Sequence, residues 1–227
     1  MDQNRYRLFL LCASILVAFG SANALAQTRD PYLSWTADQA VKIGKEMRVS
    51  DRIGRAFDLR LINTDKAINY KLRVTWLTPE VIRASARLEQ LRSRLSDQET
   101  IALVKEAEAA GDTVFLIEID PREGSGVIPL DWRVLLQPVG PSESAITGIK
   151  SPSLRKVKAL SSVLRRDYDY DIFWVVFPLV DADKKPVLTS DIAQVQLVVG
   201  IYGNEATITW SIPSSVRDRI KTIAENK

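Results

Sequence analysis

The chain has 227 residues, with 31 basic and 28 acidic side chains, no histidine and a single cysteine. Without histidine, Ser-His-Asp and Cys-His nucleophile systems and histidine-ligated metal centres are excluded. The net charge of +3 is too small to predict a nucleic-acid partner.

The amino terminus has the three parts of a secretory signal peptide. Arg5 and Arg7 supply positive charge, residues 8–19 form an apolar stretch, and residues 21–26 offer small side chains for cleavage. The apolar stretch is shorter than the roughly 20 residues that cross a bilayer. We therefore expect a cleavable leader over residues 1–26, and no transmembrane span once it has been removed.

The rest of the chain, residues 27–227, is expected to form a single domain. Cys12 lies inside the leader, so the exported part contains no thiol, and it contains no Asn-x-Ser/Thr acceptor for a glycan. A domain of this size buries enough surface to fold without disulfides. These features predict a bacterial protein that is periplasmic or secreted.

The first expected strands form a hairpin. In residues 57–61 and 68–76 the apolar side chains fall at every second position, which places them on one face of a strand. Residues 63–66 between them have the composition of a turn. The two segments therefore predict an antiparallel pair.

A helical period of three to four residues replaces this alternation between residues 78 and 111. Thr78 is expected to cap a helix that begins with Pro79. Ser96 and Glu99 form the capping box of a second helix, which Gly111 would close. This helical hairpin can cover a sheet edge or an open end of the β core, or it can present a surface to a partner.

Further strands are expected in the second half of the chain. The segments with alternating or continuous apolar side chains are 114–119, 127–137, 172–179, 192–202 and 206–212. Residues 138–169 fit either a short helix that starts at Ser151-Pro152 or an irregular edge. Pro213 ends the last strand, and Ser214 or Ser215 is expected to cap a C-terminal helix.

At least seven strands separated mostly by turns predict a mainly β (α+β) fold. The expected architecture is an antiparallel β-sandwich or partly open barrel, with an inserted helical hairpin at about 79–110 and a C-terminal helix. A doubly wound α/β sheet is not expected, because strands and helices do not alternate regularly.

An unusual run of aspartates precedes one of the strands. Asp167, Asp169 and Asp171 would share one face of an extended chain, where their oxygen atoms could bind calcium. The same face continues into Phe173 and Val175, so a strand that enters the core from solvent also explains the run. We assign no metal and no cofactor to it.

A cluster of basic residues lies immediately upstream, between residues 150 and 166, with no acidic residue among them. Such a cluster could bind an anionic polymer, or it could be a solvated surface that offsets the aspartates. The basic residues are Lys150, Arg155, Lys156, Lys158, Arg165 and Arg166.

The sequence contains no motif that defines a reaction, and no catalytic residue is assigned. We expect an exported, non-enzymatic envelope protein that acts as a protein-interaction or structural binding module, with another envelope protein or an envelope polymer as its partner. One alternative is a small carboxylate-dependent hydrolase of an envelope glycan, with Glu118 and Asp120 as candidate carboxylates. A further alternative is anionic polymer binding through basic residues 150–166.

Overall fold

The computed structural model describes residues 30–53, 70–121, 131–140, 145–161, 171–181, 183, 185–189, 191–201 and 203–225. The chain divides into two units, Met1–Ser34 and Trp35–Lys227. The described part of the first unit is a short 3-10 helix, η1 (Pro31–Ser34), in which the Leu33 N–H donates to the Asp30 carbonyl. The elements that follow belong to the second unit.

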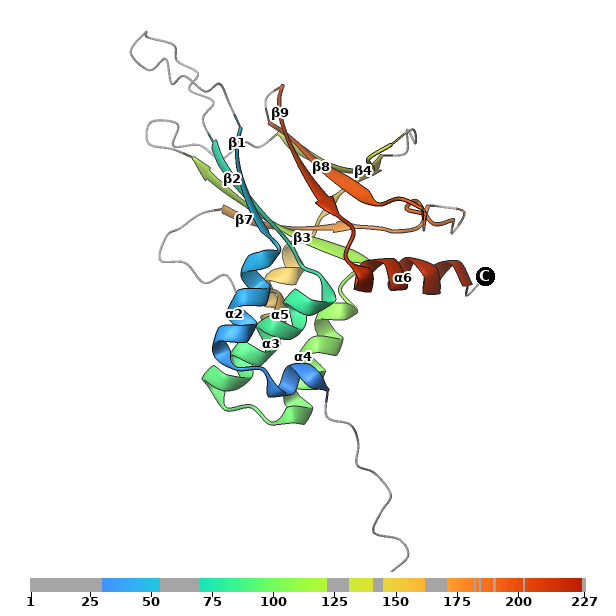
Figure 1. Ribbon diagram of the computed structural model, residues 1–227. Helices are drawn as coiled ribbons and strands as arrows, with labels where there is room; N and C mark the ends of the chain where they lie inside the picture. The colour runs from blue at the N-terminus through green and yellow to red at the C-terminus, as the bar shows by residue number, and fades with distance from the viewer. Residues whose placement is uncertain are drawn as a thin grey trace, which may run out of the picture. The chain divides into compact units, whose positions relative to one another are not determined.

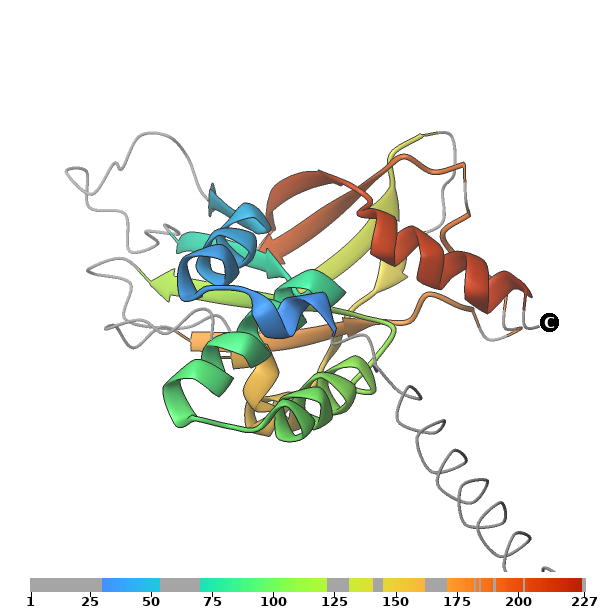
Figure 2. The same ribbon diagram turned by 60° about the horizontal axis from the view of Figure 1, so that its bottom comes forward.

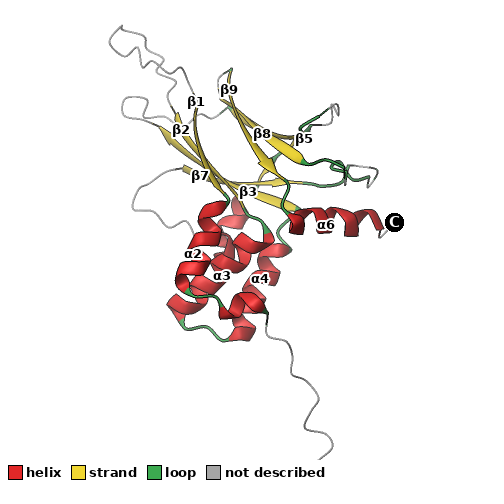
Figure 3. Cartoon of the chain, viewed as in Figure 1, coloured by secondary structure: helices red, strands yellow, loops and turns green. Residues whose placement is uncertain are grey.

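Two antiparallel sheets form the centre of the second unit (Figures 1 and 3). Sheet A has the strand order β1-β2-β3-β7-β6, and sheet B has the order β5-β4-β8-β9. The strands of sheet A are β1 (Arg48–Ile53), β2 (Tyr70–Trp76), β3 (Thr113–Pro121), β6 (Ile149–Lys150) and β7 (Asp171–Phe177). Those of sheet B are β4 (Trp132–Pro138), β5 (Ile146–Thr147), β8 (Gln194–Ile201) and β9 (Asn204–Ser211). The predicted mainly β fold with antiparallel sheets is confirmed.

A bend at Gly148 joins the two sheets along one side. β5 pairs with β4 of sheet B, and β6, only one residue later, pairs with β7 of sheet A. The Gly148 N–H donates to the Val134 carbonyl at 2.9 Å. On the other side β1 contacts β9, although these strands belong to different sheets. The strands therefore surround one interior, as in a partly open barrel whose corner is turned at a glycine.

Alternate side chains of both sheets fill this interior. An aromatic cluster lies at its centre: Trp76 stacks on Phe115 with ring centroids 5.0 Å apart and meets Trp210 edge-on at 6.1 Å. Phe115 also meets Phe177 edge-on at 5.5 Å. Trp76, Phe115 and Phe177 have no exposed surface. The period-two pattern of the sequence thus places the largest side chains between the sheets.

Four helices pack together on the side of sheet A that faces away from sheet B (Figures 1 and 2). They are α2 (Ala37–Glu46), α3 (Pro79–Ser93), α4 (Asp97–Glu108) and α5 (Lys158–Ser161). The three longer helices each begin after a hydroxyl residue that accepts a backbone N–H, namely Thr36, Thr78 and Ser96. The 3-10 helix η2 (Pro152–Lys156) precedes α5. Helices α3 and α4 follow each other between β2 and β3 and contact each other, which confirms the predicted helical hairpin.

The C-terminal helix α6 (Ser214–Glu225) closes the chain as predicted. Val216 and Ile220 are buried in the same core cluster as the strand side chains, and Ile223 packs against that cluster. The helix therefore covers part of the interior that the strands leave open.

Several local features differ from the sequence-based expectations. The predicted strand 57–61 lies outside the described residues, and β2 pairs instead with β1. The prediction that Gly111 closes the second helix is wrong, because α4 ends at Glu108 with Ala109 as its C-cap. Gly111 serves close packing, since a Cβ there would lie 2.5 Å from the Val176 side chain. Of the two alternatives left open for residues 138–169, the structure has the short helix after Ser151-Pro152, as η2 followed by α5.

Candidate functional site

The turn between α3 and α4, together with the helix ends beside it, forms the outer end of the helical hairpin. We call residues 91–99 the hairpin tip. Helix α3 ends because Arg94 adopts the left-handed conformation, with φ of 55°. The Leu95 N–H then donates to the Gln90 carbonyl at 3.1 Å, which closes the last turn of α3. Two residues later Ser96 starts the next helix, so the tip contains little unconstrained backbone.

The start of α4 is fixed by a complete capping box. The Ser96 hydroxyl accepts the Glu99 N–H at 3.2 Å, and the Glu99 carboxylate accepts both the N–H and the hydroxyl of Ser96 at 2.7 Å. These hydrogen bonds from Ser96 hold the pKa of Glu99 below its ordinary value. The ionised Glu99 carboxylate therefore stabilises the cap at pH values above the pKa that Glu99 has in the unfolded chain. This stabilisation is lost as the pH falls through the lower pKa of Glu99 in the folded protein.

Buried polar side chains brace the tip from its inner side. The Glu89 side chain is 3% exposed, forms an ion pair with Arg92 and accepts the Ser93 hydroxyl at 2.8 Å. Gln90 is also buried; its amide donates to Asp97 at 2.8 Å and accepts from Arg87 at 2.6 Å. A buried carboxylate and amide with these partners hold both sides of the turn in one arrangement.

The outer surface of the tip combines charge with an exposed apolar side chain. Leu91 is 42% exposed, and Arg92, Ser93, Arg94, Ser96, Gln98 and Glu99 are exposed around it. Among the described residues, Val139 and Ile149 are the other large hydrophobic side chains with this degree of exposure. Other apolar side chains of the hairpin are buried, such as Val81 and Val104, or half-buried, namely Leu88, Leu95, Ile101 and Leu103. Most of the apolar stripe therefore belongs to the fold, and the tip is the part that stays available.

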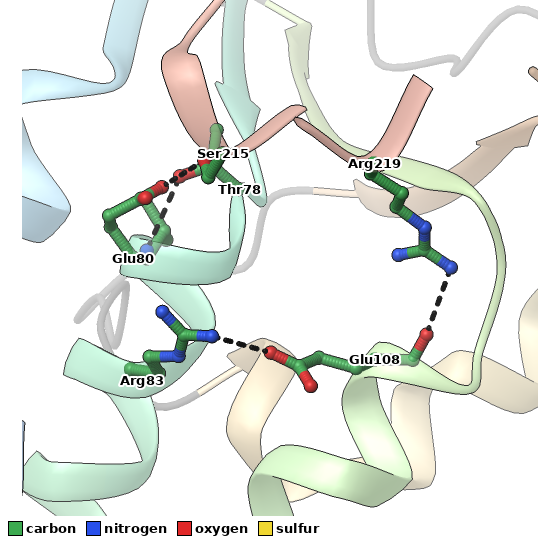
Figure 4. Close-up of polar contacts among 7 residues, drawn as sticks. Thr78, Glu80, Arg83, Glu108, Ser215 and Arg219 are labelled. Atoms are coloured by element: carbon green, nitrogen blue, oxygen red, sulfur yellow. Dashed lines mark hydrogen bonds and ion pairs between the residues drawn. The ribbon is translucent and has the colours of Figure 1, made fainter. Parts of the chain in front are cut away.

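The base of the hairpin is tied to α6 by a group of polar contacts (Figure 4). The Ser215 hydroxyl donates to Glu80 at 2.9 Å, which joins α6 to the first turn of α3. The Arg219 guanidinium donates to the Glu108 carbonyl at 3.4 Å, and the Arg83 guanidinium donates to the Glu108 carboxylate at the same distance. A cavity of about 20 Å³ between these elements has room for roughly one water molecule. The contacts suit a structural joint, and the hairpin is thereby fixed at its base as well as at its tip.

The predicted basic residues do not form one surface in the part of the chain that the structure describes. Lys150 on β6 lies opposite Val175, whose side chain faces the interior, and its Nζ is 3.9 Å from the Trp132 ring centroid. Partial burial lowers the pKa of Lys150, and the nearby Asp131 carboxylate opposes that shift. The guanidinium carbon of Arg155 instead lies 5.8 Å from the ring centroid of Trp174. Trp174 is next to Val175 on β7, so its side chain is on the face of sheet A opposite to that of Lys150.

Arg155 also has a clear structural role. Its guanidinium donates to the Ile172 carbonyl at 2.9 Å, at the edge of β7 that the two-residue strand β6 leaves uncovered. Lys156 on η2 and Lys158 on α5 are exposed. Arg165, Arg166, Asp167 and Asp169 lie outside the described residues, and Asp171 is described only by its backbone, as the first residue of β7.

The two candidate carboxylates of the hydrolase alternative lie on one face of β3. Glu118 is buried and its carboxylate is 3.4 Å from the Arg48 guanidinium, whereas Asp120 is half-buried. The charge of Glu118 is therefore compensated by Arg48 of β1, a strand of the same sheet. Within the described ranges, no three acidic, histidine or cysteine side chains are grouped so that they could hold a metal ion. The helices of those ranges are all too short or too polar to cross a bilayer.

Comparisons of the chain with protein-family models, with curated proteins and with solved structures find no match. The sequence predicted the helical hairpin, but it did not distinguish the tip from the rest of the hairpin. The capping box at Ser96 gave its position, but the bracing by Glu89 and Gln90 depends on burial that periodicity does not reveal.

Proposed function

We propose that the protein is an exported, non-enzymatic module of a bacterial cell envelope, periplasmic or secreted, and that it binds a protein partner through the hairpin tip. The leader-like residues 1–26 support the export part of this proposal. A processed protein is expected to begin at Gln27, which sequencing of the amino terminus of the secreted or periplasmic form would test. An amino terminus at Met1 would contradict the export proposal.

The observation that carries the contact proposal is the preorganisation of the tip. Its backbone is fixed by the capping box and by the left-handed Arg94, and its side chains are braced by buried Glu89 and Gln90. A surface that is already ordered loses little conformational entropy when a partner binds. Leu91 would supply the apolar anchor, and the exposed charges around it would supply the polar rim that protein interfaces commonly have.

Charge introduced at Leu91 tests this proposal. We expect Leu91→Glu to weaken binding to envelope proteins by about tenfold or more, the loss typical when an interface anchor is changed. The measurement is quantitative recovery of partners by the immobilised protein from a solubilised envelope fraction. Because Leu91 is exposed, the variant should keep the circular dichroism spectrum and melting temperature of the parent.

Val139→Glu is the matched control, since Val139 is exposed to a similar degree but follows β4 of sheet B, far along the chain from the hairpin. We expect it to recover the same partners as the parent. If both variants recover every partner equally well, the tip is not the contact surface.

A further inference from the structure

The short strand β5 lies at the edge of sheet B and pairs on one side only, with β4 (Figure 3). The Gly148 N–H donates to the Val134 carbonyl, so these residues form a hydrogen-bonded pair of this ladder. Because such pairs alternate along an antiparallel ladder, three groups point away from β4: the Ala145 carbonyl and the N–H and carbonyl of Thr147. Among the described residues, none of these three groups has a hydrogen-bond partner.

Pro178 keeps sheet A from covering this edge. β6 continues the chain directly after β5, and its register with β7 would bring Thr147 opposite Pro178. A proline has no N–H to donate to the Thr147 carbonyl, so β7 ends at the preceding residue. The chain after Pro178 forms a small turn of its own, in which Val180 is bridged to Pro186.

An open groove of about 560 Å³ lies between β5 and this turn. Its volume is in the range of ligand-binding pockets. Ile146 from one wall belongs to the core cluster, and Val187 from the other wall packs against it, so the groove lies beside the apolar interior. Asp181 and Lys185 are its charged residues, and both are exposed. The other lining residues are Ala145, Thr147, Pro178, Val180 and Pro186.

An unpaired strand edge beside an apolar groove fits an extended peptide. A peptide strand that pairs with β5 donates its N–H groups to the carbonyls of Ala145 and Thr147 and accepts the Thr147 N–H. Every second side chain of such a strand enters the groove, because side chains alternate between the two faces. The lining contains one acidic and one basic residue, whose charges offset each other, which favours an uncharged segment.

We propose that the groove beside β5 binds an extended, uncharged segment of a partner protein, with apolar residues at alternate positions, as an added strand along residues 145–147. This site is separate from the hairpin tip, and it does not depend on the contact function proposed for the tip.

Selection of random seven-residue peptides displayed on phage, with the purified protein as the target, tests this site. We expect the enriched peptides to alternate apolar and polar residues. Methylation of backbone nitrogens in a synthetic copy should weaken its binding by about tenfold at alternate positions, where the N–H groups pair with β5. Enrichment of no peptide, or equal binding of the methylated and unmethylated copies, would overturn the proposal.

Two variants of Thr147 locate the bound peptide. Thr147→Pro removes an N–H that has no partner in the protein, and proline is tolerated on an edge strand, so we expect a melting temperature close to the parental value. The same change removes a donor to the added strand and should weaken peptide binding by about tenfold or more. Thr147→Val, the matched control, keeps the N–H and should bind as the parent does.

Leu91→Glu distinguishes this site from the hairpin tip, and it should bind the selected peptides as tightly as the parent. Peptides that bind Thr147→Pro as tightly as Thr147→Val, or that are lost with Leu91→Glu alone, would contradict the assignment to the groove. The methylation series uses the parent protein, so it decides the proposal even if Thr147→Pro does not fold.

Discussion

Replacing Trp76 with alanine is expected to lower the free energy of unfolding by about 3–5 kcal/mol, the range for large aromatic-to-alanine changes in a protein core. Trp76 has no exposed surface, stacks on Phe115 and meets Trp210 edge-on. Its deletion therefore leaves a cavity between the two sheets, bordered by aromatic rings that cannot easily collapse. Chemical denaturation of parent and variant under identical conditions measures the change.

A second variant separates the packing of Trp76 from its hydrogen bond. The Trp76 indole N–H donates to the Thr113 hydroxyl at 2.7 Å. Thr113→Val removes this acceptor and leaves the ring in place, with an expected cost of about 1–3 kcal/mol for the unpaired indole N–H. A loss in Trp76→Ala no larger than that in Thr113→Val would mean that the aromatic cluster is not the centre of the core.

Gly148→Ala is expected to destabilise the protein by about 1–3 kcal/mol, because it overpacks the corner where the chain passes from sheet B to sheet A. A Cβ at position 148 would lie 2.4 Å from Val175 Cγ1 and 2.8 Å from Phe177 Cζ, both in the buried interior. Neither side chain can withdraw without disturbing β7. The free energy of unfolding from urea titration measures the cost.

Gly200→Ala provides the matched control for Gly148→Ala. A Cβ at position 200 would meet the side chain of Arg133 at 3.2 Å, and that side chain is exposed and flexible. We expect a much smaller loss than in Gly148→Ala. Equal losses in the two glycine variants would show that the corner at Gly148 is not under special steric constraint.

The strands and capped helices were predictable because their signals are local. Alternation in the segment around Tyr70–Trp76 fixes which side chains face the interior, and Thr78-Pro79 and Ser96-Glu99 mark the helix starts directly. The C-terminal helix follows from Pro213 and the spacing of Val216, Ile220 and Ile223. In each case a few neighbouring residues carry the whole signal.

Other features depend on contacts between distant parts of the chain, and the sequence did not reveal them. β5 and β6 are two residues each, too short for any period, and they exist because Gly148 lets the chain bend against Val175. β1 carries three charged residues, Arg48, Asp51 and Arg52, which interrupt any apolar alternation, and it is defined by its pairing with β2. Gly111 resembled a helix cap, but its position is set by Val176 of β7.

The candidate sites show the same division. The hairpin was expected from its helical period. The bracing of the tip depends on the burial of Glu89 and Gln90, and burial is not predicted for charged or amide side chains, which are mostly exposed. The basic cluster looked continuous in sequence, but the strand geometry puts Lys150 and Arg155 on opposite faces of sheet A. Residues adjacent in sequence are therefore a poor guide to a shared surface where strands and turns alternate.

Amide hydrogen exchange, measured on the protein alone and after incubation with a solubilised envelope fraction, tests most directly whether the tip is the contact surface. We predict that amide exchange slows at residues 91–99 when partners are present, while the strands of sheet B exchange at the same rate as in the protein alone. Slower exchange on β9 or β4 with no change at the tip, or no change anywhere, would contradict the proposal that this module acts through its helical hairpin.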